Sequence, residues 1–81
     1  MTIQEIKDIF NIDITAKKRT ELQVYLKTLY VEKNKSQKSI LQLSKDLNCS
    51  HSTLLYNLKR LDTYNLDPLF MYVVKAFKTK D

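Results

Sequence analysis

Residues 39–61, SILQLSKDLNCSHSTLLYNLKRL, decide the fold of this chain. Apolar residues recur at three- and four-residue spacing in two short segments, one on each side of a three-residue turn. This spacing is typical of two amphipathic helices that each bury one face. Two such helices joined by a tight turn form a helix-turn-helix, whose second helix can enter the major groove of DNA. The pattern also fits a plain helical hairpin in a small bundle, which we keep as the alternative.

Five polar residues mark the ends of these helices and the turn, and three of them, Ser44, Asn48 and Ser50, stand at offsets that favour a helix-turn-helix over a plain hairpin. Ser39 and Ser50 can each cap the start of a helix, and Gln42 stands where the partner of a capping box belongs. Ser44 is small at the point where the second helix must cross close above the first. Asn48 stands where the turn needs a left-handed backbone, which asparagine tolerates better than most residues. We therefore expect a helix-turn-helix over about residues 39–61.

The second helix of this motif has an apolar face and an outer face. Leu54, Leu58 and Leu61 form the stripe that we expect to be buried. The residues on or near the outer face are His51, Ser52, Leu55, Tyr56 and Lys59. Other aromatic residues are expected in or near the core, namely Tyr25, Tyr30, Phe70, Tyr72 and Phe77. Tyr56 differs from them because an aromatic residue on the outer face has less reason to pack internally.

The rest of the chain predicts an all-α protein, a small bundle of about five helices. Its 81 residues suffice for one domain, residues 1–81, with a single modest core. The sequence has no glycine and one proline but many Leu, Ile and Lys residues, which favours helices. Strong start signals are the capping box of Thr2 with Glu5 and the pair Asp67-Pro68. Further helices are expected over residues 3–10, 20–32 and 68–78, with connectors at 11–15, 34–38 and 62–66.

Composition argues against several other classes of protein. No apolar run approaches the roughly 18 residues of a transmembrane helix, and the N-terminus lacks the basic and apolar regions of a secretory signal. One cysteine allows no internal disulfide, and with one histidine it leaves no usual zinc-ligand set. The acidic residues are scattered and the histidine has no evident orienting partner, so we expect no enzyme. The expectation is a cytoplasmic protein without metal or cofactor.

The positive charge is concentrated in the middle of the sequence. The chain carries a net charge of +5. Residues 17–60 hold ten Lys or Arg against three acidic residues, whereas the segments before and after them have net charges of −2 and 0. All the excess charge thus lies in the segment that contains the expected helix-turn-helix. A polyanion partner is the simplest explanation, although loose lysines also serve solubility.

Two features together resemble a known DNA-binding domain. The segment His51-Ser52-Thr53 opens the second helix of the motif, and the cluster Lys17-Lys18-Arg19 precedes the helix expected at 20–32. This plan is similar to the C-terminal DNA-binding domain, domain IV, of the bacterial replication initiator DnaA, over roughly residues 6–75. The sequence departs from that family at Ser50, where the family has an acidic residue. The ATPase domain of the initiator has no counterpart in this sequence.

The resemblance implies roles for particular residues. In that family the histidine and the next hydroxyl residue contact base edges in the major groove, which implies this role for His51 and Ser52. Basic loop residues of the family reach the adjacent minor groove, which implies that Arg19, helped by Lys18, does so here. Lys27 is the nearest counterpart of an Arg-Gln pair in the family's following helix. General rules agree, because recognition helices present their first residues to bases and arginine suits a narrow minor groove.

Sequence-specific binding of double-stranded DNA is therefore the expected function. The residues expected to contact DNA are Lys17, Lys18, Arg19, Lys27, Lys38, Ser50, His51, Ser52, Thr53, Tyr56 and Lys59. A stand-alone domain of this kind fits a phage or mobile-element regulator, or a replication accessory factor. The alternative function is a protein-interaction module that binds a partner through its Leu55-Tyr56 face.

Overall fold

The computed structural model describes residues 2–17 and 20–80, with the backbone alone for Lys80. These residues form no strand and six helices, which are α1 (Ile3–Phe10), α2 (Glu21–Asn34), α3 (Ile40–Asp46), α4 (His51–Lys59), α5 (Leu61–Tyr64) and α6 (Pro68–Lys80). The prediction of a small all-α bundle is confirmed. Within the described ranges no helix has the length and apolar character needed to cross a membrane.

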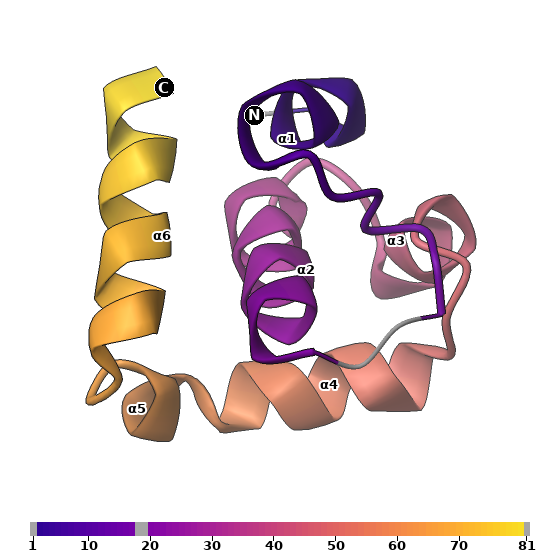
Figure 1. Cartoon of the computed structure of the whole chain (residues 1–81). Helices are drawn as coiled ribbons and strands as arrows, with labels where there is room; N and C mark the ends of the chain where they lie inside the picture. The colour runs from indigo at the N-terminus through magenta and orange to yellow at the C-terminus, as the bar shows by residue number, and fades with distance from the viewer. Residues whose placement is uncertain (1, 18–19, 81) are drawn as a thin grey trace.

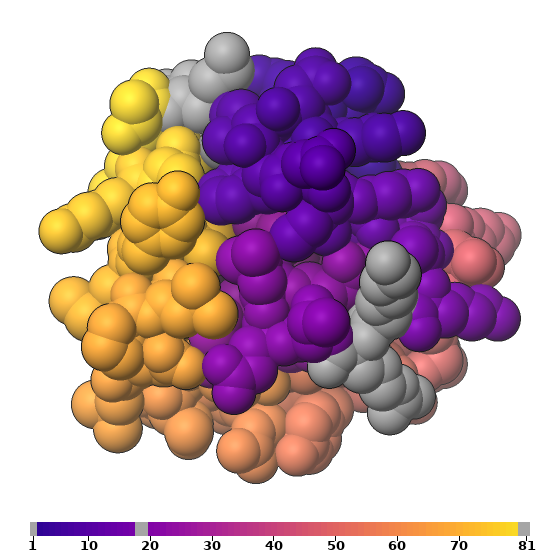
Figure 2. Space-filling view, viewed as in Figure 1, coloured from indigo at the N-terminus to yellow at the C-terminus, as the bar shows by residue number. Residues whose placement is uncertain are grey.

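Helix α2 stands at the centre of the bundle (Figure 1). It packs against α4, α6 and α3. Helix α4 lies along the base of the bundle beneath the N-terminal end of α2, and α1 lies across the opposite end (Figure 1). Side chains fill the spaces between the ribbons in the same view (Figure 2). This arrangement leaves the outer side of α4 free of other helices at the base of the molecule.

Almost every helix contributes to the core. Residues 25–31 of α2 are all buried, because helices surround α2 on several sides. The fully buried side chains around them include Ile6, Leu43, Leu54, Phe70 and Phe77. Tyr72 was expected in or near the core, but it is 61% exposed and its ring meets the bundle through an edge contact with Phe10.

Local capping signals predicted the helix starts correctly. Thr2 and Glu5 form the expected reciprocal capping box, in which Thr2 Oγ1 accepts from Glu5 N–H at 3.1 Å and Glu5 Oε1 accepts from Thr2 N–H at 3.0 Å. Before Pro68, Asp67 Oδ1 accepts from Leu69 N–H at 2.9 Å and caps α6. Side-chain oxygens therefore satisfy N–H groups that have no partner inside the helix.

The segment predicted as a plain connector, residues 62–66, overlaps α5, a single helical turn. The bundle consequently has six helices instead of about five. The ring of Tyr64 lies 5.0 Å from the ring of Tyr25 and 5.9 Å from that of Phe70, and its hydroxyl donates to Asn57 Oδ1 at 3.1 Å. These tertiary contacts hold the turn, since one helical turn is not stable on local propensity alone.

One partly buried hydrogen bond joins α2 to the start of α6. The Tyr25 hydroxyl donates to Asp67 Oδ2 at 2.6 Å, across 42 residues of sequence. The hydrogen bond lowers the pKa of Asp67, and the same bond together with burial raises the pKa of Tyr25 to about 12. Asp67 thus caps α6 with one oxygen and binds α2 with the other.

We predict that Tyr25→Phe destabilises the fold and changes its response to alkali. Loss of the buried hydroxyl should cost about 1 kcal/mol, or roughly 4–8 °C in Tm for a domain of this size. In the unchanged protein the unfolded chain ionises Tyr25 near pH 10, whereas the folded chain keeps the proton up to a pKa of about 12. The contribution of Tyr25 to stability is therefore fully present below pH 10 and is lost as the pH rises toward 12. Tyr25→Phe, which lacks this contribution, should lose less stability over the same pH range.

Thermal melts between pH 7 and pH 12 measure both effects. Tyr72→Phe is the matched control, because Tyr72 is 61% exposed and loss of its hydroxyl should change the stability little. Equal alkaline loss of stability in Tyr25→Phe and in the unchanged protein would contradict the role assigned to this hydrogen bond.

Candidate nucleic-acid interface

The turn between α3 and α4 has the backbone that the sequence predicted. Asn48 has a φ of 54°, in the left-handed region. The N–H of Cys49 donates to the Ser44 carbonyl at 3.0 Å and closes the end of α3. Ser50 Oγ accepts from Thr53 N–H at 3.2 Å and caps α4. Helices α3 and α4 pack against each other across this turn.

The start of α3 is capped, but not by a complete capping box. Ser39 Oγ accepts from Gln42 N–H at 3.1 Å as expected. The Gln42 side chain donates to Asp46 Oδ1 at 3.0 Å, instead of accepting from the N–H of Ser39 as a capping box requires. Lys38 Nζ lies 3.1 Å from the other Asp46 oxygen. Hydrogen bonds from Gln42 and Lys38 lower the pKa of Asp46, and the bond to Asp46 raises the pKa of Lys38. The charge of Lys38 is thus already paired with a carboxylate.

Helix α4 presents a core face and an outer face. Leu54 is buried and Leu58 is half-buried, in agreement with the predicted stripe. Asn57, which the sequence reasoning missed, is buried beside them and accepts a hydrogen bond from Tyr64. The exposed residues of α4 are His51, Ser52, Thr53, Leu55, Tyr56 and Lys59.

Arg60 extends this outer face, although it was not among the residues predicted to contact DNA. Its Nη1 donates to the Tyr56 hydroxyl at 3.2 Å. The guanidinium carbon lies 5.5 Å from the centre of the Tyr56 ring and 6.0 Å from that of Tyr64. The four-residue spacing between Tyr56 and Arg60 is a sequence signal that could have indicated the pair. Two aromatic rings therefore hold a cation beside the exposed side of α4.

Two buried side chains of α2 hold the segment that precedes it. Gln23 Nε2 donates to the carbonyls of Asp13 and Ala16 at 2.9 and 3.1 Å. Lys27 Nζ donates to the Ala16 carbonyl at 3.3 Å. Gln23 was missed by the sequence reasoning, although a glutamine three residues before buried Leu26 was a signal. These bonds fix the chain just before the basic cluster.

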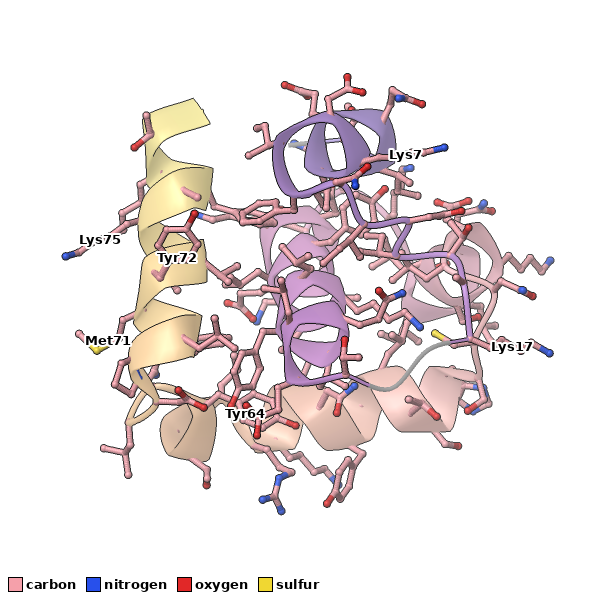
Figure 3. The ribbon with its side chains drawn as sticks, in the orientation of Figure 1. Lys7, Lys17, Tyr64, Met71, Tyr72 and Lys75 are labelled. Carbon is pink, nitrogen blue, oxygen red and sulfur yellow. The ribbon has the colours of Figure 1, made fainter. Side chains whose placement is uncertain are left out.

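The basic cluster itself is only partly described. Lys17 is exposed and lies on the α4 side of the molecule, near the first half of that helix (Figure 3). Lys18 and Arg19, both predicted to contact DNA, lie outside the described residues. The described part of the cluster therefore lies beside the helix that was predicted to read bases.

An open depression of about 1150 Å³ brings many of the predicted residues together. It lies between the segment before α2, the end of α3 and the start of α4. The predicted contact residues that line it are Lys17, Lys27, Ser50, Ser52, Thr53 and Tyr56. Lys45, which was not predicted, adds a third lysine, and no carboxylate is among the lining residues. The depression is basic and rich in hydroxyl groups.

A second depression of about 540 Å³ continues along α4 toward α5. Val24 and Tyr56 line both depressions and so separate them. The second one is lined by Arg60 but also by the carboxylates of Glu21 and Asp67. The surface along α4 is therefore basic at the N-terminal end of the helix and mixed in charge at the other end.

Three predicted contact residues, Lys38, His51 and Lys59, do not line the basic depression. His51 is exposed at the first position of α4, and Lys59 is exposed in its last turn. Lys38 lies beyond the other end of α3, paired with Asp46. His51 and Lys59 thus share a helix with the depression, whereas Lys38 does not.

Other chemistry in this region is limited. Burial raises the pKa of the Cys49 thiol, against the opposite effect of the nearby Lys27 ammonium, and a thiol with a raised pKa is a poor nucleophile at neutral pH. Among the described residues no group of three or more His, Cys, Asp or Glu side chains is arranged to hold a metal ion. The chain matches no protein-family model, no curated protein and no solved structure. The resemblance to the initiator domain accordingly stays a prediction.

We predict that the left-handed turn at Asn48 is sensitive to side-chain type. Asn48→Ala should destabilise the fold by about 1 kcal/mol, because alanine has a higher cost than asparagine in this conformation, and Asn48→Gly should be close to neutral. Thermal melts of both variants measure the difference. Asn65→Ala is the control, since Asn65 is exposed with a φ of −61°. A loss in Asn65→Ala equal to that in Asn48→Ala would show that backbone conformation is not the cause.

Proposed function

We propose that this protein binds double-stranded DNA, with α3 and α4 acting as a helix-turn-helix. In this proposal α4 enters the major groove and the basic loop before α2 reaches the neighbouring minor groove. The observation that carries the proposal is the basic depression, which joins Lys17, Lys27 and Lys45 to the start of α4. Positive charge and the candidate base-reading residues therefore lie on one side of the molecule, where a duplex could meet both.

The exposed face of α4 has the chemistry that base recognition needs. Recognition helices contact base edges mainly through their N-terminal residues. His51 and Ser52 occupy the first turn of α4 and are exposed, and each can donate or accept a hydrogen bond. Tyr56 follows one turn after Ser52 and is 57% exposed. These three side chains could touch bases while Leu54 remains in the core.

The distribution of charge favours one placement of the phosphate backbone. The basic depression holds lysines without carboxylates, whereas the second depression contains Glu21 and Asp67. Phosphates would be attracted to the N-terminal end of α4 and repelled near these two carboxylates. We therefore place the closest backbone strand over the basic depression.

For the cellular role we propose a cytoplasmic regulator of a phage or mobile element, or a replication accessory factor. This role rests on the resemblance to domain IV of DnaA. The second candidate function is a protein-interaction module. It is favoured by Leu55 and Tyr56, two large apolar side chains that are 43% and 57% exposed on α4.

We predict that affinity for duplex DNA falls steeply with salt. Lysines that neutralise phosphates release counterions, so the logarithm of the binding constant should decrease linearly with the logarithm of salt concentration, with a slope corresponding to a few phosphate contacts. Fluorescence anisotropy with a labelled random duplex between about 50 and 200 mM salt measures the slope. Binding that does not depend on salt, or no binding at the lowest salt, would reject the DNA-binding proposal.

We predict that substitutions on the outer face of α4 reduce sequence preference without unfolding the protein. On a duplex selected from a random pool, His51→Ala and Tyr56→Ala should each cost about 1–3 kcal/mol, with little change on random duplex. Tyr72→Ala is the matched control, because Tyr72 is equally exposed but belongs to α6 (Figure 3). If both α4 variants bind the selected site normally, α4 is not the reader, and the interaction module becomes the better explanation.

A further inference from the structure

Lys27 is a buried cation whose charge has no anionic partner in the described part of the chain. Its side chain belongs to the central helix α2 and the residue is 8% exposed. Within the described residues its ammonium donates to a neutral acceptor, the carbonyl of Ala16 at 3.3 Å. The ion pairs of the described residues involve Lys35 with Glu32 and Lys38 with Asp46. Lys27 also lines the basic depression, so an anion bound there would supply the missing counter-charge.

The surroundings of Lys27 are those of an anion site. Lys27 lines the basic depression together with Lys17 and Lys45, both of which are exposed. Residues of the first turn of α4 also line the depression. At the start of a helix, backbone N–H groups and the positive end of the helix dipole favour an anion. Ser52 and Thr53 add hydroxyl groups to its wall. Residues with donor groups from three segments of the chain thus line one depression, and no lining carboxylate competes with a bound anion.

We propose that this depression is a phosphate site, with Lys27 as its buried cation. The proposal rests on the proposed function in that the phosphate would belong to the DNA backbone beside the start of α4. A phosphate group fits better than a carboxylate, because its several oxygens can accept from donors that converge from different directions. A free phosphate ion has the same chemistry and could occupy the same site. Lys27 would then anchor the strand from inside the fold, whereas Lys17 and Lys45 would hold it from the rim.

The test compares Lys27→Met with the unchanged protein. Methionine keeps the length and apolar stem of lysine but removes the charge. In chloride, Lys27→Met should melt close to the unchanged protein, because Gln23 also donates to the Ala16 carbonyl and methionine keeps the apolar stem. Inorganic phosphate, at the same ionic strength as chloride, should raise the Tm of the unchanged protein and leave that of Lys27→Met in place. Lys75→Met is the matched control, since Lys75 projects outward from α6 (Figure 3) and should retain the full response to phosphate.

A second measurement locates the phosphate on DNA. A set of duplexes, each with one neutral methylphosphonate in place of a backbone phosphate, is bound to both proteins. One position should weaken binding of the unchanged protein about tenfold and have no effect on Lys27→Met, while other sensitive positions weaken both. If Lys27→Met melts far below the unchanged protein, the same measurement is made with Lys45→Met, since Lys45 is exposed and lines the same depression. A smaller loss at the same methylphosphonate position then supports the site, and an unchanged profile overturns it.

The outcomes separate this proposal from the proposed function. If the unchanged protein binds duplex DNA and Lys27→Met gives the same affinity and methylphosphonate profile, the phosphate site is wrong and the DNA-binding proposal stands. If neither protein binds duplex but phosphate stabilises only those with Lys27, the site takes free phosphate and the DNA-binding proposal fails. If phosphate acts equally on all variants and no methylphosphonate position depends on Lys27, the phosphate site is overturned.

Discussion

Burial of α2 against α3, α4 and α6 is the constraint on which the rest of the fold depends. Seven consecutive residues of this helix, 25–31, are buried, so polar side chains within it must find partners inside the protein. Thr28 does so through the carbonyl of Val24, and Gln23 does so through the carbonyls that precede the basic cluster. Tyr25 uses its hydroxyl to hold the start of α6. The polar groups of the central helix therefore position the loop and the last helix.

Much of the fold could be predicted from the sequence because its signals are local. Caps act within three residues, and the start signals at Thr2, Ser39, Ser50 and Asp67 all correspond to observed helix starts. The left-handed residue at Asn48 is local in the same sense. The single turn of α5 could not be predicted, because it depends on contacts of Tyr64 with residues of α2, α4 and α6.

The candidate site was predictable only in part, for a similar reason. Helical spacing placed Ser52 and Tyr56 on the outer face of α4, and both are exposed. Spacing does not show which lysines have partners. Lys38 is paired with Asp46, whereas Lys27 is buried and donates a hydrogen bond to the carbonyl of Ala16. Lys45 was overlooked because its significance depends on neighbours from other segments, which one-dimensional patterns do not contain. The spacing of Arg60 from Tyr56 was a signal, but the contact of Arg60 with Tyr64 was not.

The hydrogen bond from Tyr64 to Asn57 has a consequence for how α4 is held. Asn57 belongs to α4, Tyr64 packs against Tyr25, and Tyr25 binds Asp67. A continuous line of contacts thus runs from the inner face of α4 to the first turn of α6. This line of contacts holds α4 on the bundle, together with the turn that joins α4 to α3. A substitution at Asp67 should therefore alter the position of α4 through Tyr25 and Tyr64.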